Sequence, residues 1–426
     1  GRGNPPPALV HMQEDYRDQI AALPVGEPSC YQGPNPRFAM PKEVACFSRD
    51  SDRKIHFDDR ALRSYTAPAL PVALDSGFEQ YIPKDNVDDP APLGDILSAL
   101  SARHVTPQPG QLITFRNNLN KLMVTPYALA EDWEIGVDSQ PGGVVQLHVR
   151  ETARKRQEEA SRDERGKRMA YWGYRFEQVC CSSPGQAERS PATPAPAASN
   201  PLSSAAAQSA PSPEEYRVPS PSDAESYRHI CSANEFAQLK QRYESEGSVN
   251  ANEEFCCILR LEIEKVRIFM AAEIDCREDG KGYVELKTSK LIRQERDKRT
   301  FERYKMLKFW LQSFLAGVPR IIVGFRDDSG LVHELRTLKT LELPRMVREK
   351  QLWDPSVCLN FGRLALDWLV HEVAKLPDTT RYVLRYDPGR RSMYLWRLHG
   401  SAHMIANESA GAGETVERGL KRPRCE

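Results

Sequence analysis

A cysteine motif of the metal-binding or redox type is missing from this sequence, although the chain of 426 residues contains ten cysteines. None of them belongs to a CxxC pair, and none has a histidine at the spacing of zinc ligands. The sequence therefore shows no zinc module. The scattered thiols are typical of reduced, buried cysteines in an intracellular protein.

A net charge and a long apolar run are missing too. Lys plus Arg equals Asp plus Glu, at 59 each, so nucleic-acid binding would have to come from local patches. No apolar stretch approaches the roughly 18 to 20 residues that span a bilayer, and the N-terminus lacks a signal-peptide pattern. We therefore expect a soluble protein of the cytosol or nucleus with no membrane partner.

Three segments have a composition that disfavours a packed core. Residues 182–249 are rich in Ser, Ala and Pro, and we interpret them as a disordered insertion. Residues 1–24 are predicted to form a flexible arm, and residues 401–426 a disordered basic tail. The remaining stretches, 25–181 and 250–400, are predicted to form one catalytic domain together.

The second of these stretches has the clearest periodicity. Residues 266–275 alternate between an apolar face and a face that carries Glu273 and Asp275, which predicts a strand with an acidic end. Residues 277–282 have turn chemistry, and residues 283–287 resume an extended pattern. The simplest interpretation is two neighbouring strands joined by a short turn.

Helices and further strands follow along the chain. The patterns predict helices over 299–315 and 361–376, and hairpins that pair 320–326 with 331–335 and 381–386 with 392–398. This order indicates a mixed α/β (α+β) fold of largely antiparallel sheets flanked by helices, in a single globular domain.

The two acidic strands carry the candidate chemistry. Glu285 and Lys287 share one face of their strand, where they would converge with Asp275. Carboxylates are natural ligands of the divalent cations that assist phosphate hydrolysis, and the Leu286 carbonyl could complete the metal shell. A lysine beside them can hold or deprotonate the attacking water, or stabilise charge on the phosphate.

Taken alone, this pattern also describes solvated residues on an outward strand face. The interpretation as a metal site is favoured because the opposite strand face is apolar and because a basic helix follows. Between Lys290 and Lys308 eight Lys or Arg stand against three acidic residues. Such an excess suits a polyanionic substrate, although a solvated helix face would explain most of these charges.

Several separated motifs resemble the DXO family of decapping and NAD-cap-removing enzymes, which includes fungal 5′-pyrophosphohydrolases that partner the nuclear 5′–3′ exoribonuclease. The motifs lie in both structured stretches. They are Gly173-Tyr174-Arg175-Phe176-Glu177, Glu273-Ile274-Asp275, Glu285-Leu286-Lys287, Lys308-Phe309-Trp310-Leu311-Gln312, Phe115-Arg116 with Thr125-Pro126-Tyr127, the stretch from Cys46 to Arg63, and residues 353–358.

The resemblance implies a PD-(D/E)XK-nuclease-like active-site core and roles for its residues. It implies that Glu177, Asp275, Glu285 and the Leu286 carbonyl bind one or two Mg²⁺ or Mn²⁺ ions, with Glu273 assisting in catalysis. It further implies that Lys287 and Gln312 act on the scissile phosphate and that Arg116 binds the substrate's phosphates. Glu177 lies too far upstream for spacing to reveal it, although Met169, Trp172 and Phe176 predict a helix with one apolar face there.

Two departures from the family pattern stand out. Ala272 occupies a position where the family usually has Gly, and its small methyl group is expected to be tolerated. The insertion lengthens a connection that is shorter in animal members, and we expect it to form a surface loop.

The leading hypothesis is a metal-dependent hydrolase of the nucleus that removes pyrophosphate, unmethylated caps or NAD caps from RNA and leaves a 5′-monophosphate for 5′–3′ decay. Whether the protein also has 5′–3′ exonuclease activity of its own is left open by the sequence. An alternative is a subunit whose main work is to stabilise and stimulate the nuclear exoribonuclease. A third hypothesis is a DNA nuclease with the same metal core. The basic cluster at residues 421–424 is compatible with nuclear import.

Overall fold

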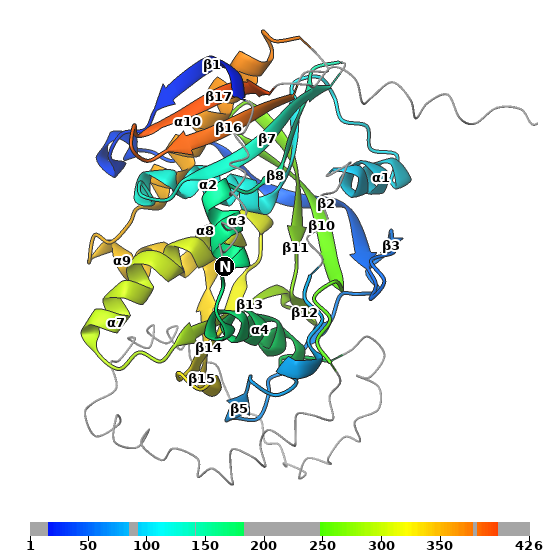
Figure 1. Ribbon diagram of the computed structural model, residues 1–426, viewed down its shortest axis with the longest axis vertical. Helices are drawn as coiled ribbons and strands as arrows, with labels where there is room; N and C mark the ends of the chain where they lie inside the picture. The colour runs from blue at the N-terminus through cyan, green and yellow to red at the C-terminus, as the bar shows by residue number, and fades with distance from the viewer. Residues whose placement is uncertain (1–15, 85–92, 141, 183–247, 378–380, 399–426) are drawn as a thin grey trace, which may run out of the picture.

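The computed structural model describes residues 16–84, 93–140, 142–182, 248–377 and 381–398. Within these residues the strands form a ten-stranded and a seven-stranded sheet (Figure 1). The larger sheet has the order β1 (Tyr16–Pro24), β17 (Ser392–Leu398), β16 (Arg381–Asp387), β7 (Trp133–Gln140), β8 (Val144–Arg150), β6 (Gln111–Phe115), β11 (Val266–Glu273), β10 (Glu254–Ile263), β2 (Phe38–Arg49) and β3 (Ile55–His56).

The smaller sheet has the order β5 (Val72–Ala73), β15 (Leu331–Lys339), β14 (Arg320–Arg326), β13 (Gly282–Lys290), β12 (Cys276–Glu278), β4 (Ser64–Tyr65) and β9 (Cys181–Ser182). Most strand pairs are antiparallel; β6–β11, β6–β8, β13–β14 and β12–β4 are parallel. The expected fold class of mixed, largely antiparallel sheets is confirmed.

Helices cover both sheets. They are α1 (Gly94–Ala102), α2 (Arg116–Val124), α3 (Ala153–Ala160), α4 (Glu164–Val179), α7 (Glu295–Thr300), α8 (Met306–Ala316), α9 (Leu343–Arg348) and α10 (Pro355–Val373). Short 3₁₀ turns lie at Pro28–Tyr31, Phe78–Gln80, Thr125–Tyr127 and Thr340–Glu342, and a π-helical turn at Phe301–Lys305 joins α7 to α8. No helix among the described residues is long and apolar enough to span a membrane.

The main core lies between the two sheets. Residues of β11 and β14 pack there with α8 and α10, for example Met270, Val323, Trp310 and Phe361. A second core holds α4 against the opposite face of the smaller sheet, and a third holds α1 against the larger sheet. The smaller sheet is therefore covered on both faces, and the candidate site residues of β13 lie where helices from both sides meet it.

The acidic strand pair differs from its prediction. The apolar face of residues 266–274 is confirmed, since all its members lie in the main core. However, β11 belongs to the larger sheet and β13 to the smaller one, so these strands are not neighbours. Both edges of β11 are already paired, with β10 and with β6. The predicted turn instead joins β12 to β13, and Asp275 lies at the crossing between the sheets.

The predicted helices and hairpins are present with shifted ends. The helix over 299–315 begins earlier, at Glu295, and includes the π-helical turn. The helix over 361–376 begins at Pro355, because Asp354 caps it and accepts a hydrogen bond from the Ser356 amide at 2.8 Å. In α4, Trp172 and Phe176 are buried as expected, but Met169 is 46% exposed, and Tyr171 takes its place in the core.

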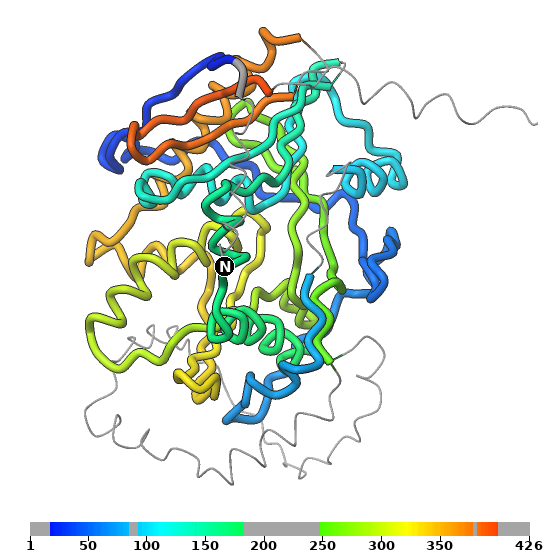
Figure 2. The backbone as a smooth tube through the Cα atoms, viewed as in Figure 1, coloured from blue at the N-terminus to red at the C-terminus, as the bar shows by residue number. Residues whose placement is uncertain are grey.

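The ends of the chain also differ in part from expectation. Residues 16–24 of the predicted arm form β1, which pairs antiparallel with β17, so segments from both ends of the sequence lie side by side (Figure 2). The rest of the arm, residues 183–247 of the insertion and the whole tail lie outside the described residues. At the borders of the insertion, Ser182 lies in β9 and Val249 is buried.

Candidate active site

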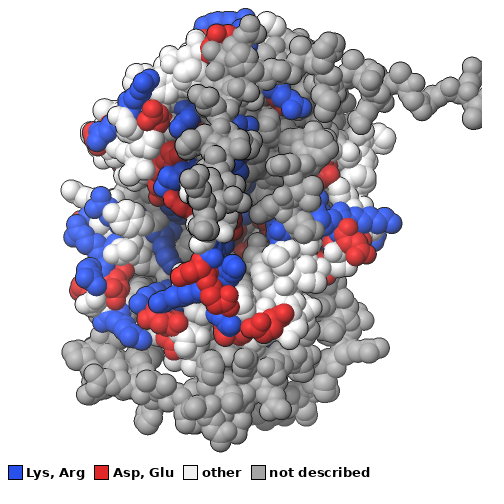
Figure 3. Space-filling view, in the orientation of Figure 1, with Lys and Arg blue, Asp and Glu red and all other residues white. Residues whose placement is uncertain are grey.

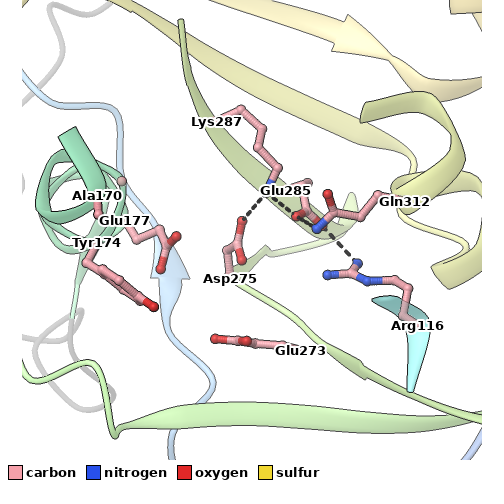
Figure 4. Close-up of a pocket in the computed structure, with 10 residues that line it drawn as sticks. Arg116, Ala170, Tyr174, Glu177, Glu273, Asp275, Glu285, Lys287 and Gln312 are labelled. Carbon is pink, nitrogen blue, oxygen red and sulfur yellow. Dashed lines mark hydrogen bonds and ion pairs between the residues drawn. The ribbon is translucent and has the colours of Figure 1, made fainter. Parts of the chain in front are cut away.

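One pocket collects the side chains singled out from the sequence. It lies at the end of β11, along the edge of β13 and between α4 and α8 (Figure 4). Its lining consists of Arg116, Ala170, Gly173, Tyr174, Glu177, Glu273, Asp275, Glu285, Lys287 and Gln312. All the predicted side chains therefore meet in one place, although they come from three helices, two strands and the crossing between the sheets.

The crossing between the sheets places Asp275 at the centre of this pocket. The preceding Ile274 is buried, and its amide donates to the Phe255 carbonyl at 2.9 Å, which holds the crossing against β10. The Leu286 amide donates to Asp275 Oδ2 at 2.6 Å. The Asp275 side chain is only 8% exposed, and burial together with the nearby Glu285 carboxylate raises its pKa to about 7.

Glu285 is the most enclosed carboxylate of the site, with a side chain that is 1% exposed. Arg116 NH1 donates to Glu285 Oε2 at 3.0 Å, and Gln312 Nε2 donates to Oε1 at 2.6 Å. Lys287 is also paired with Glu285, and its Nζ lies 3.9 Å from Asp275 Oδ2. Burial alone would raise the pKa of Glu285, but Arg116 and Lys287 more than offset burial and lower it.

Parallel strand ends explain how Arg116 reaches this carboxylate. β6 runs parallel to β11, with Phe115 beside Ala271, so both strands end at the same edge of the sheet. Arg116 is the first residue after β6 and begins α2, which packs against α8. Arg116 and Gln312 therefore approach Glu285 from adjacent helices.

Glu177 reaches the pocket from α4. Ala170, Gly173, Tyr174 and Glu177 follow the i, i+3, i+4, i+7 pattern of one helix face. The opposite face of α4, with Trp172 and Phe176, packs against the smaller sheet. Burial raises the pKa of Glu177 well above its ordinary value, and the negative charges of Asp275 and Glu273 raise it further.

Glu273 lies at the rim of the pocket, with its side chain 43% exposed. Lys84 Nζ is 3.7 Å from Glu273 Oε2, and it also pairs with Glu254, whose other oxygen forms an ion pair with Arg49 Nε at 2.8 Å. The neighbouring Ala272 is buried in the main core and does not line the pocket. Its methyl group therefore points away from the site, which gives a physical reason for the expected tolerance.

The backbone of β13 is available to the site at Leu286. β12 pairs with β13 only as far as Val284, so the same edge of β13 faces the pocket beyond that residue. The amide and carbonyl of one strand residue point to the same side. Because the Leu286 amide reaches Asp275, its carbonyl points toward the pocket as well.

The donor set fits a hard divalent cation. The pocket lining includes four carboxylates, while Lys287 and Arg116 supply two positive charges, which leaves an excess of two negative charges. The donors are oxygens, as Mg²⁺ and Mn²⁺ prefer. Among the described residues, no three acidic, His or Cys side chains stand close enough to hold an ion as they are placed, so Glu177, Asp275 and Glu285 would have to draw together.

Sequence reasoning identified these residues unevenly. Periodicity found Glu273, Asp275, Glu285 and Lys287, whereas Glu177, Arg116 and Gln312 came from the resemblance alone. Lys84 was missed, because nothing in its local sequence marks it. The roles assigned to the individual residues remain predictions.

Comparisons with known proteins show the family to which the chain belongs. The family described as RAI1 like PD-(D/E)XK nuclease matches residues 39–204 and 225–410. The chain is 32% identical over 365 residues to Decapping nuclease RAI1 of Aspergillus fumigatus, with 81% of this chain and 85% of the relative covered. It is 30% identical over 388 residues to Decapping and exoribonuclease protein of Xenopus laevis, with 85% of this chain and 83% of that protein covered.

Solved structures show the same fold. S. pombe Rai1 in complex with 3′-FADP has a TM-score of 0.63 and 26% identity, and the match covers 89% of this chain and 99% of that chain. Candida albicans Rai1 in complex with pU5-Mn²⁺ has a TM-score of 0.66 and 23% identity, over 88% and 93% of the two chains. The extent of these matches leads to one conclusion: the chain belongs to the RAI1-like PD-(D/E)XK nuclease family.

Proposed function

We propose that this protein is a divalent-metal-dependent hydrolase that cuts phosphate linkages at the 5′ end of RNA and leaves a 5′-monophosphate. The observation that carries this proposal is the convergence of Glu177, Asp275 and Glu285 with Lys287 in one pocket. The substrates that we propose are RNAs with a 5′-triphosphate, an unmethylated cap or an NAD cap. The similarity to the Decapping nuclease RAI1 of Aspergillus and the Decapping and exoribonuclease protein of Xenopus supports this class of substrate.

The metal would be Mg²⁺ or Mn²⁺, held by Glu177, Asp275, Glu285 and the Leu286 carbonyl. When bound, such an ion neutralises charge that develops on the phosphate and lowers the pKa of a water molecule. Two of these carboxyls have raised pKa values in the metal-free protein, Asp275 and Glu177. A cation would relieve the repulsion that raises them.

Other side chains would position the reactants. Lys287 holds its proton firmly, because Glu285 and Asp275 raise its pKa in spite of burial. It is therefore suited to donate hydrogen bonds to water or phosphate oxygens rather than to act as a base at neutral pH. Arg116 and Gln312 fix both oxygens of Glu285, and they stay close enough to the pocket to contact a phosphate.

Incubation with defined RNAs tests the proposal. Purified protein with Mg²⁺ or Mn²⁺ should convert at least one of triphosphorylated, unmethyl-capped and NAD-capped RNA to 5′-monophosphate RNA. The Asp275→Asn variant should not. If the wild-type protein leaves all three substrates untouched, the proposal is wrong.

We further propose that the protein acts in the nucleus together with a 5′–3′ exoribonuclease, which would degrade the monophosphorylated product. The basic cluster at residues 421–424 and the resemblance to fungal family members support this setting. Co-purification of the exoribonuclease with the Asp275→Ala/Glu285→Ala variant would separate binding from chemistry. If the variant still stimulates the exoribonuclease and sustains cell function, the alternative of a mainly stabilising subunit is correct.

A further inference from the structure

The far end of β13 carries a second polar cluster, beyond the metal pocket. Glu285, Lys287 and Ser289 alternate along the strand and therefore share one face. Ser289 is 3% exposed, and its hydroxyl accepts a hydrogen bond from Lys305 Nζ at 3.2 Å. Lys305 ends the π-helical turn before α8, so the helix that supplies Gln312 to Glu285 also supplies a lysine to Ser289.

Lys305 has a neutral partner, unlike the cations of the pocket. Lys287 and Arg116 both contact Glu285, whereas no carboxylate among the described residues lies within ion-pair distance of Lys305. Burial lowers the pKa of Lys305, and the positive charge of Arg326 lowers it further. Among the described residues, neither Lys305 nor Arg326 therefore forms an ion pair with a carboxylate.

Arg326 is the nearest further cation, and it lies on the face of the smaller sheet that α4 covers, since it is paired with Lys290 rather than with Ser289 along the strands. It is 9% exposed, and its guanidinium lies 4.4 Å from the centre of the Trp172 ring. Its NH1 donates to the Asp327 carbonyl at 3.1 Å, but its buried Nε has no partner among the described residues. No ion pair within the described part of the chain neutralises Arg326.

The nearby acids are already engaged. Asp327 Oδ2 lies 2.8 Å from His333 Nε2, and its Oδ1 accepts from the Ser329 and Leu331 amides. Asp328 pairs with Lys290 at 3.1 Å and with Arg165 at 3.4 Å. In the view of Figure 3, Lys and Arg side chains gather beside the central hollow on the side of α7 and α8.

We propose that Lys305 and Ser289 form a binding subsite for a second phosphate of the substrate. Ser289 lies two residues from Lys287 along an extended strand, or about 7 Å, a distance that neighbouring phosphates of one RNA chain can bridge. A phosphate oxygen would accept from the Lys305 ammonium and the Ser289 hydroxyl, and it would supply the negative charge that the cluster lacks. This inference rests on the proposed function, because it assumes a substrate with several phosphates.

Either of two phosphates of an RNA substrate would fit the subsite. One belongs to the RNA backbone on the 3′ side of the cleaved linkage, and the other to the 5′ group that leaves. Both have the same chemistry, so variants of Lys305 must be compared on substrates that differ in length and in the 5′ group.

The test uses the Lys305→Met variant, which removes the charge and keeps the aliphatic stem. Arg303→Met is the matched control, since Arg303 is exposed and lies two residues away on another helix face. We expect Lys305→Met to raise the KM for a 5′-triphosphorylated decamer about tenfold, the value of one charged hydrogen bond, while Arg303→Met changes it less than about twofold. The slope of log KM against log salt should fall by about 0.7 for Lys305→Met.

Substrate length then identifies the phosphate. If the subsite binds RNA backbone, the KM for a nucleoside triphosphate stays the same in Lys305→Met while that for the decamer rises. If it binds the leaving group, both KM values rise together. A wild-type KM for Lys305→Arg supports a role of the positive charge. A smaller rise of the KM for Ser289→Ala supports a role of the Ser289 hydroxyl beside Lys305.

Equal KM values for Lys305→Met, Arg303→Met and wild type would overturn the inference. This outcome is distinct from failure of the proposed function, in which wild-type protein hydrolyses none of the RNAs. In that case fluorescence anisotropy with the unhydrolysed 5′-triphosphorylated decamer, which carries both kinds of phosphate, still decides the matter. Lys305-dependent binding would support the subsite, and binding that is equal in all variants would exclude it.

Discussion

Two lysines that approach the same strand have opposite surroundings. Lys287, at the middle of β13, contacts Glu285 and lies near Asp275, and these carboxylates raise its pKa. Lys305, at the end of β13, contacts a serine hydroxyl and lies near Arg326, and its pKa is lowered. The surroundings of Lys287 therefore have surplus negative charge, which suits a metal ion. The surroundings of Lys305 have surplus positive charge, which suits a phosphate.

The largest effect is expected from removal of a metal ligand. Asp275→Asn should lower the hydrolysis rate by about a thousandfold or more, since the variant loses a carboxylate that we propose as a ligand of the cation. The metal-free variant should also unfold at a higher temperature than wild type at pH 8, because it removes a buried charge that repels Glu285. Single-turnover kinetics and calorimetry would measure both effects. Activity within about tenfold of wild type would contradict the metal assignment.

The two lysines themselves provide the next test. Lys287→Met should lower kcat about a hundredfold, whereas Lys305→Met should raise the KM. Lys287→Met should also destabilise the metal-free protein by about 1–3 kcal/mol, because Glu285 and Asp275 lose their neighbouring cation. Lys305→Met leaves no carboxylate without a partner, so its stability should match that of wild type. Equal losses of stability in the two variants would remove the contrast between the regions.

Space in the pocket gives a third, smaller effect. A Cβ at Gly173 would meet no atom within 4 Å, so the glycine leaves room for substrate rather than for packing. Gly173→Leu should lower kcat/KM about 10- to 100-fold with little change in unfolding temperature. Gly173→Ala should add about 0.5–1 kcal/mol of stability, as expected inside a helix.

Gly324 serves as the packing control for this prediction. A Cβ there would lie 2.5 Å from the Phe176 ring, so Gly324→Ala should destabilise the fold, unlike either substitution at Gly173. If Gly173→Leu unfolds the protein while Gly324→Ala does not, Gly173 serves packing and the interpretation is wrong.

The smallest effect is the pH dependence of metal binding. Asp275 has a pKa of about 7 in the folded, metal-free protein and an ordinary, lower pKa when unfolded, so its contribution to stability is lost as the pH rises toward 7. A cation displaces the remaining protons, so the stabilisation by Mn²⁺ should grow from pH 6 to pH 8, by up to about 1.4 kcal/mol per pH unit for each proton displaced. Thermal shifts at several Mn²⁺ concentrations would show this. The same shift at pH 6 and pH 8 would contradict the raised pKa.

Local periodicity predicted the elements that carry their own pattern, and it failed where pairing depends on distant segments. The apolar face of β11, the β14–β15 and β16–β17 hairpins and the α8 and α10 helices are examples of success. That β11 pairs with β6 rather than with β13 depends on a strand about 150 residues upstream. The same limit applies to β1, whose own sequence pattern is weak and which forms a strand by pairing with β17, near the other end of the chain.

The candidate site follows the same division. Asp275, Glu285 and Lys287 could be predicted because the chain spacing between them is short. Arg116, Glu177 and Gln312 required the family resemblance, since their convergence depends on helix packing. Lys84 and the pairing of Lys305 with Ser289 were found only in three dimensions, although the excess of basic residues between Lys290 and Lys308 had indicated a polyanionic substrate.

The most direct test of the central claim is mass spectrometry of the products from defined 5′-triphosphorylated, unmethyl-capped and NAD-capped RNAs in isotope-labelled water. We expect 5′-monophosphate RNA that carries the label, formed by wild-type protein with Mg²⁺ or Mn²⁺ and not by Asp275→Asn. Unchanged RNA with all three substrates, or equal product from the variant, would contradict it.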